Sequence, residues 1–331
     1  MNDHEHLSGL VEPVFMMSRD IMKQFRQHGA LISDSGARFL VDHYDAMQDQ
    51  RIRAGNQIGA LKRLAEKAGR SEEPHEALDY LNAQFSHLEK QIGKMLAVYV
   101  STHEMGWFFE QTMGIGPILA AKLLAHIDIT KAPTAGHIFN YAGLNPERVW
   151  AKGQLRPFNA RLKKACWLLG DSFVKTSSRE GSYYGKLYRA RKREEWARNV
   201  AGELVEQAEA KLGKCRIGES TDAIQWYEGR MDPRKVAAAL DAGDKPGKAC
   251  AADAPEAGVR MLPPAHIDAR ARRWAVKLFL SHLHERWYES HYGEKPPKPF
   301  AIAQLGHAHQ IHPPQVAPKK PAATEPRQVA A

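Results

Sequence analysis

Cysteine is scarce in this chain of 331 residues, which contains three. Cys166, Cys215 and Cys250 lie far apart and are odd in number, so the sequence has neither the paired spacing of a zinc site nor a disulfide framework. Cysteine usage of this kind suits a reducing compartment. The cysteine pattern therefore excludes a small disulfide-stapled domain.

Long apolar runs are also missing. No uninterrupted run approaches the roughly 18 residues of a membrane-spanning helix, and the first residues lack the positive and then apolar order of a secretory signal. Hydrophobic residues nevertheless make up 43% of the chain, enough to bury a substantial core. The composition predicts a soluble, cytoplasmic protein with no membrane partner.

A convergent set of metal ligands is lacking as well. His282 and His284 are two residues apart on an expected helix and therefore point to different faces. His307 and His309 stand in an expected irregular segment without a cysteine or a carboxylate cluster nearby. We identify no metal site and no cofactor, and a divalent metal would require a carboxylate site supplied elsewhere.

Charge is distributed unevenly along the chain. Residues 147–199 hold 14 Lys and Arg against five Asp and Glu, whereas residues 1–110 hold 12 basic and 16 acidic side chains. The local surplus of nine equals the formal net charge of +9 of the whole chain. Because affinity for polyanions grows with the number of phosphates neutralised, this concentration favours nucleic-acid binding over a merely solvated surface.

The segment 113–125, MGIGPILAAKLLA, has the composition of a helix-hairpin-helix. Gly114 and Gly116, on either side of Ile115, permit positive φ, and Pro117 presets φ for the first turn of a new helix. The hairpin amides and the helix N-terminus would then face a phosphate, with Lys122 on the following helix as a further contact. The alternative is a tight turn between two core helices.

Helical periodicity dominates the first hundred residues. Apolar residues recur at alternating spacings of three and four over 40–65 and again over 78–99, which predicts two long amphipathic helices. Turn residues at 69–74 predict that the pair folds back as an antiparallel hairpin. The same apolar stripe suits a dimerisation seam, and the sequence leaves internal packing and self-association open.

Three further helices are expected to be basic. One follows Pro157, a second runs over 183–212 with four aromatic residues that either stack on bases or pack in the core, and a third covers 266–288. Cations near a helix N-terminus oppose the helix dipole, which suggests an anionic partner. The expected DNA-contacting cations on and around these helices are Arg156, Arg161, Lys163, Lys164, Lys186, Arg189, Arg191, Lys192, Arg193, Arg270, Arg272 and Arg273.

The predicted fold is therefore mainly α. A long antiparallel helical hairpin is followed by a helix-hairpin-helix domain and basic helices. The expected division is 1–105 for the hairpin or oligomerisation region, 106–213 for the DNA-binding domain, 214–265 for a partly helical and flexible connection, 266–293 for a basic helix, and 294–331 for a Pro-rich, mostly irregular tail.

Three linked blocks resemble the C-terminal domain of the insertion-sequence 110/116/902 transposases. They are GIGPILAAKLLAHID at 114–128, FNYAGLNP at 139–146 and NARLKKA at 159–165, and their order and spacing also fit. The preceding helical pair resembles the linker helices of that family. The resemblance implies a mobile-element protein that binds DNA as a homo-oligomer, with a structured guide RNA as a further partner in such systems.

The sequence departs from that family at its catalytic elements. Family members begin with a ribonuclease-H-like domain bearing four metal-binding carboxylates, whereas this N-terminus shows helical periodicity. Family members also place a nucleophilic serine shortly after the second block, where this chain reads ERVWAKGQ at 147–154. From the resemblance we therefore adopt the DNA-binding hairpin and the basic helix, but we assign no catalytic residue. Whether this chain cleaves and transfers DNA strands is left open by the sequence.

Three interpretations follow from these observations. The first is a transposase-family DNA-binding protein that acts in DNA transposition and recombination. The alternative is a non-catalytic DNA- or RNA-binding accessory or regulatory protein derived from a transposase. A helical scaffold whose positive stripe binds nucleic acid only non-specifically is a third interpretation.

Overall fold

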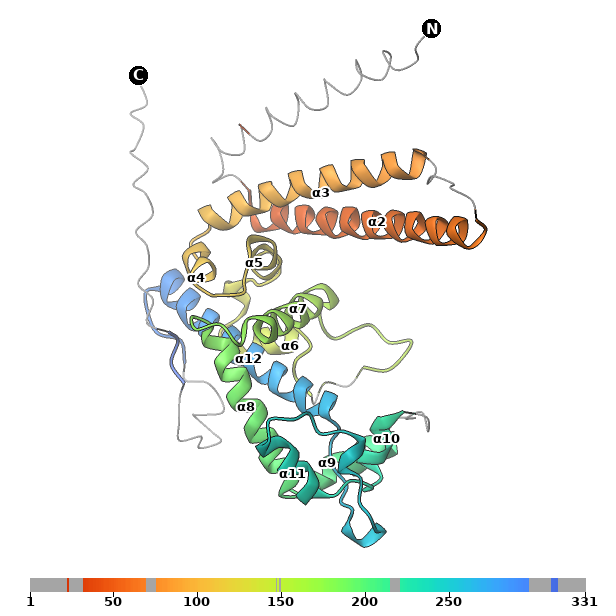
Figure 1. Cartoon of the computed structure of the whole chain (residues 1–331). Coiled ribbons are helices and arrows are strands. Elements are labelled where there is room, and N and C mark those ends of the chain that lie inside the picture. The colour runs from red at the N-terminus through yellow and green to blue at the C-terminus, as the bar shows by residue number, and fades with distance from the viewer. Residues whose placement is uncertain are drawn as a thin grey trace, which may run out of the picture. The chain divides into compact units, whose positions relative to one another are not determined.

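The computed structural model describes residues 23, 32–69, 76–146, 148, 150–214, 221–297 and 311–314. Within these ranges every regular element is helical, and the β-pairing consists of two isolated bridges at Met231 (Figure 1). The prediction of a mainly α fold is confirmed. The described residues fall into two compact units, 1–166 with 283–331 and 167–282, whose limits lie inside helices α7 and α12.

The helices follow one another along the chain with short connections between most of them. They are α2 (Asp34–Lys67), α3 (Glu76–Thr102), α4 (Gly106–Glu110), α5 (Pro117–Leu124), α6 (Ala135–Tyr141), α7 (Ala160–Thr176), α8 (Tyr183–Val200), α9 (Val205–Lys214), α10 (Asp222–Tyr227), α11 (Pro233–Asp241) and α12 (Pro264–Tyr292), with short 3-10 turns at Ile129–Lys131, Lys248–Cys250 and Pro255–Ala257.

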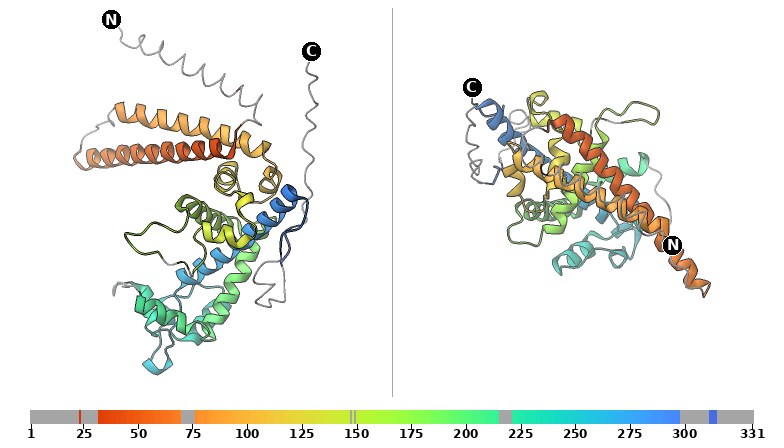
Figure 2. Two further views of the ribbon diagram at one scale, coloured as in Figure 1. Left: turned by 180° about the vertical axis from the view of Figure 1, so that it is seen from behind. Right: turned by 90° about the horizontal axis from the view of Figure 1, so that it is seen from above.

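The long helices α2 and α3 pack side by side and run antiparallel (Figures 1 and 2). The side chain of Ser33 caps α2 by accepting a hydrogen bond from the backbone N–H of Gly36 at 3.2 Å. At the same end of the pair, Tyr99 near the end of α3 donates to Asp34 at the start of α2, at 2.8 Å. Both helices match the predicted periodic segments, and the turn predicted at 69–74 lies almost wholly outside the described residues.

The same two helices leave part of their apolar stripe uncovered. Leu61 of α2 and Leu81 and Leu88 of α3 are exposed, whereas Tyr99 of α3 is buried. The apolar stripe is therefore covered only along part of its length. Self-association through the uncovered part stays a prediction.

The short helices α4 and α5 belong to the first unit, and both contact α3. Helix α5 contacts both α2 and α3, and it buries Leu123 and Leu124 completely. Phe108 and Phe109 of α4 are buried in the same unit and meet edge to face at 6.0 Å between ring centroids. The loop between α4 and α5 is thus held by apolar packing on both sides.

The second unit has its own apolar core around Trp196 and Trp226, whose rings lie 5.8 Å apart. Met231, Met261 and Leu262 are fully or almost fully buried in it. The Ala-, Gly- and Pro-rich segment 242–264 belongs to the predicted connection 214–265, and its residues Cys250, Met261 and Leu262 are buried in this core. These few apolar residues were not singled out in the sequence, because Ala, Gly and Pro dominate the composition around them.

Asn199 fixes that segment from within the core. Its Nδ2 donates to the carbonyl of Leu262 and its Oδ1 accepts from the N–H of Leu262, both at 2.9 Å. Asn199→Ala should lower the free energy of unfolding by about 3 kcal/mol, since two buried backbone groups lose their partner. Urea unfolding followed by circular dichroism measures this. The exposed Asn56→Ala serves as control with a change within about 0.5 kcal/mol, and equal effects of the two would contradict the assignment.

Candidate nucleic-acid interface

The turn between α4 and α5 has the predicted geometry at only one of its two glycines. Gly114 has φ of 96°, in the left-handed region that favours glycine. Gly116 precedes α5 with φ of −84° and ψ of 170°, an extended conformation open to any residue, and an added Cβ would meet nothing within 4 Å. Ile115 between them is buried. Pro117 occupies the first turn of α5, as expected.

Lys122 is not available to a polyanion. It is buried in α5 with 6% of its surface exposed, and its ammonium bonds to Asp45 of α2 at 2.5 Å. It also lies 5.3 Å from the ring centroid of Tyr44. The prediction of Lys122 as a DNA contact is therefore corrected: this cation secures α5 to α2.

The start of α7 gathers cations around a strong cap. Asn159 accepts hydrogen bonds from the N–H groups of Arg161 and Leu162 at 2.9 and 3.0 Å. Arg161 pairs with Asp42, and Lys164 approaches Asp45 within 3.8 Å. Both cations keep more than half of their side chains exposed, so α2 balances their charge without covering them.

Two neighbouring cations have aromatic rather than acidic partners. The ammonium of Lys163 lies 4.2 Å from the ring centroid of Phe158, and the guanidinium of Arg156 lies 5.3 Å from the ring centroid of Trp150. Among the described residues no carboxylate pairs with either cation, and both are exposed. Their full charge is therefore presented to solvent.

Helix α8 divides its cations between two faces. Lys186, Arg189 and Arg193 follow a three-and-four spacing along one side and are all exposed. Arg191 and Lys192 turn toward other side chains of their unit: Arg191 bonds to Glu195 at 2.6 Å and Lys192 bonds to Asp268 at 2.8 Å. The first group forms an exposed basic face, and the second group forms internal ion pairs.

The carboxylates of these internal pairs are held ionised by their partners. Burial would raise the pKa of Asp268, but the hydrogen bonds from Lys192 and Tyr188 outweigh it and lower that pKa. Burial likewise opposes ionisation of Glu195, whose pKa is lowered by Arg270 and Arg191. Both carboxylates are therefore charged at neutral pH, and they neutralise the cations around them.

The predicted cations of α12 follow the same division. Arg270 bonds to Glu195 at 2.7 Å, and Arg272 bonds to Asp268 at 2.5 Å and to Asp171 at 3.4 Å. Arg273 forms no ion pair with the described residues, and burial together with the charge of Arg270 lowers its pKa. Of the three, Arg273 alone lacks a direct carboxylate contact within the described ranges.

Three of the four aromatic residues of α8 are buried in the core, and Tyr183 is half-buried. Tyr184, Tyr188 and Trp196 are buried, and Tyr184 stacks on Phe173 with ring centroids 5.1 Å apart. Among the serines that follow the position of the family's nucleophile, Ser178 is exposed. Ser182 is buried, with its hydroxyl 3.1 Å from that of Thr176.

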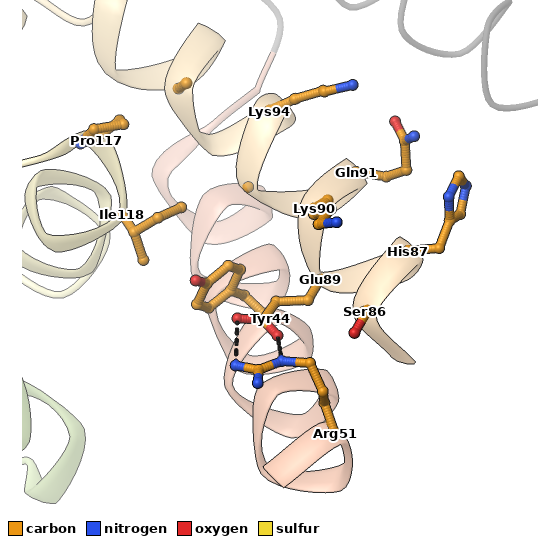
Figure 3. Close-up of a pocket in the computed structure, with 12 residues that line it drawn as sticks. Tyr44, Arg51, Ser86, His87, Glu89, Lys90, Gln91, Lys94, Pro117 and Ile118 are labelled. Carbon is orange, nitrogen blue, oxygen red and sulfur yellow. Dashed lines mark hydrogen bonds and ion pairs between the residues drawn. The ribbon is translucent and has the colours of Figure 1, made fainter. Parts of the chain in front are cut away.

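A pocket of about 860 Å³ lies beside the turn and was not expected from the sequence (Figure 3). Its wall contains Tyr44 and the ion pair between Arg51 and Glu89, which are joined at 2.5 Å. Lys90 and Lys94 of α3 also line it, as do the first residues of α5. The i, i+4 spacing of these two lysines was present in the sequence, but nothing there placed them beside α5.

His126, which follows α5, is buried without any hydrogen-bond partner for either ring nitrogen among the described residues. Burial and then the charge of Arg38 lower its pKa to about 4. At His126 the unfolded chain takes up a proton near pH 6.5 and the folded chain only near pH 4. The contribution of this residue to stability is therefore greatest above pH 6.5 and is lost as the pH falls through that interval. The total loss is about 3 kcal/mol.

His126→Leu should remove this pH dependence and raise stability at pH 7 by about 1 to 3 kcal/mol, because it replaces an unpartnered polar ring by an apolar group. Thermal unfolding between pH 4 and pH 7 measures both effects. His266, whose pKa is also lowered to about 4 chiefly by burial, contributes separately and stays intact in the variant. An unchanged pH profile would show that His126 finds a partner in solution.

Among the described residues, no group of three or more His, Cys, Asp or Glu side chains is arranged to hold a metal ion. None of the described helices is long and apolar enough to cross a membrane. The predictions for the tail after residue 294 lie mostly outside the described ranges, as does Cys215. Cys166 and Cys250 are free thiols, both buried.

In a comparison with known proteins, one family model matches the central part of the chain. Residues 108–167 match the model described as Transposase IS116/IS110/IS902 family, and these residues run from α4 into α7. No curated protein and no solved structure matches the chain. The matched segment contains the turn, the cap of α7 and the cations Arg156, Arg161, Lys163 and Lys164.

Proposed function

We propose that this chain, which carries a transposase domain of the IS116/IS110/IS902 family at residues 108–167, binds DNA during transposition of a mobile element. The family domain supports a transposase-related function. The observation that supports DNA binding concerns the cations predicted to contact DNA. Some form internal ion pairs, whereas Arg156, Lys163, Lys186, Arg189, Arg193 and Arg273 are exposed and have no carboxylate partner among the described residues.

Electrostatics explains why that sorting favours a polyanion. An exposed cation without a partner loses no existing ion pair when it contacts a phosphate, and each such contact releases condensed counterions from the nucleic acid. Arg161 and Lys164 add to the set because they stay exposed beside Asp42 and Asp45. The N-terminal amides of α5 offer uncharged donors to a phosphate near the turn.

The absence of a serine in ERVWAKGQ at 147–154 favours a second candidate function. An accessory protein derived from a transposase would keep the DNA-binding surface and lack the nucleophile. A cell-based excision assay distinguishes the two: recombination by this chain alone supports a catalytic protein, and recombination only with a separate nuclease supports the accessory role.

The partner is identified by purifying the full chain at moderate salt and sequencing the nucleic acid that remains after nuclease trimming. Recurring duplex DNA supports the proposal. A discrete RNA indicates guided recombination, in which the same cations contact an RNA–DNA complex. Light scattering on the same sample measures self-association, which we propose occurs through the exposed apolar part of α2 and α3.

A further inference from the structure

The loop between α6 and α7 is anchored firmly at its base. The backbone N–H of Asn159 donates to the carbonyl of Tyr141 at 2.8 Å, and its side-chain amide donates to the Tyr141 hydroxyl at 2.9 Å. Gly143 has φ of 63°, and the Phe158 ring packs where a side chain at 143 would otherwise stand, 2.8 Å from the ideal Cβ position. The loop therefore leaves the domain from a fixed point.

The tip of this loop, residues 150–156, is ordered by its own contacts, and we call it the finger. The indole N–H of Trp150 donates to the carbonyl of Gln154 at 2.7 Å, and the N–H of Gln154 donates to the carbonyl of Ala151 at 3.2 Å. Gly153 turns the chain with φ of 89°. The hydrogen bond from the indole N–H and the turn at Gly153 together fix the orientation of the Trp150 ring.

The finger exposes apolar surface among positive charges. Trp150 is 39% exposed and Leu155 is 96% exposed. Lys152 and Arg156 are exposed beside them, and residues 150–158 contain no Asp or Glu. The guanidinium of Arg156 lies over one face of the Trp150 ring, 5.3 Å from its centroid, so a nucleobase would stack on the opposite face. The exposed Leu155 and the neighbouring cations suit the edge of such a base and its flanking phosphates.

We propose that the finger stacks Trp150 on an unpaired or unstacked DNA base, while Lys152 and Arg156 contact the adjacent phosphates. The inference rests on the proposed DNA-binding function and adds a preference for DNA with unpaired bases. A paired base is shielded by its neighbours in the duplex, so stacking by Trp150 contributes only where a base is free. Because every base offers a π face, the contact is tolerant of sequence.

The test compares binding of the full chain to a continuous duplex and to the same duplex with a short single-stranded gap. Trp150→Ala should lower affinity for the gapped DNA about 5- to 150-fold, the range for one base stacked on an aromatic side chain, and leave affinity for the duplex nearly unchanged. Trp150→Phe loses the bond to Gln154 but keeps a ring, and should retain most of the affinity for gapped DNA.

Trp167→Ala is the matched control, because Trp167 is 63% exposed and lies outside the finger. It should change neither affinity. If wild-type protein binds both DNAs and Trp150→Ala binds them as well as wild type does, the stacking inference is overturned while the DNA-binding proposal stands. If Trp150→Ala and Trp150→Phe lose gapped DNA equally, the ring acts only as a loop anchor and the inference is likewise overturned. If wild-type protein binds neither DNA, both proposals fail.

Discussion

Replacing Lys186, Arg189 and Arg193 by glutamine is expected to lower affinity for duplex DNA about 100-fold at about 150 mM salt. These side chains share one exposed face of α8 and have no carboxylate partner among the described residues. If each contacts one phosphate, the slope of log affinity against log salt falls by about 2.7. Fluorescence anisotropy over a range of salt concentrations measures both quantities.

A matched triple substitution lies on α2. Lys62, Arg63 and Lys67 are also exposed cations on one helix, but they lie far along the chain from the matched family segment. Their replacement by glutamine removes the same formal charge and should change duplex affinity much less. If both triples lower affinity and slope equally, binding depends on net charge alone and the α8 face has no special role.

Gly185→Ala is expected to destabilise the chain by about 3 kcal/mol or more, because overpacking against backbone cannot relax by a rotamer change. A Cβ at position 185 would lie 2.7 Å from the Cα of Ser177 and 2.8 Å from the carbonyl oxygen of Phe173. It would also lie 2.3 Å from the Ser182 hydroxyl. Urea denaturation gives the change in free energy, and duplex binding should weaken as α8 shifts.

The opposite result is expected at Gly55. This glycine lies inside α2, and an added Cβ would meet nothing within 4 Å. Alanine costs less backbone entropy than glycine in a helix, so Gly55→Ala should stabilise by about 0.5 to 1 kcal/mol. Equal unfolding midpoints for the two variants would show that the close approach of α7 and α8 at Gly185 is absent in solution.

Local signals were sufficient where the relevant contacts are close in sequence. The three-and-four spacing of apolar residues predicted α2 and α3, and Pro117 marked the start of α5. Gly114 was expected to permit a positive φ and has one. Gly116 was grouped with it by composition, although its own backbone is extended. Composition identifies a turn but not which of its residues turns the chain.

Ion pairs between residues far apart in the chain could not be predicted from the sequence. Lys122 was predicted to contact DNA because it follows the turn on α5. Its partner Asp45 is 77 residues away in the sequence, so the ion pair could not be expected from local pattern. Lys192 and Asp268 are separated by 76 residues, so one basic cluster on α8 was expected where the structure has an exposed and a paired group. Trp150 was missed because its significance depends on exposure and on the neighbouring Arg156.

The pairing of Lys122 with Asp45 also bears on which part of the chain can exist independently. The family-matching segment 108–167 contains the ammonium of Lys122 but not the carboxylate that satisfies it, and the carbonyl of Ala125 likewise takes its hydrogen bond from Arg38. Excised alone, the segment would lose both of these partners and would expose the surface of α5 that packs against α2 and α3. We therefore expect the smallest piece that folds on its own to include the helical hairpin α2–α3 as well as the family-matching segment.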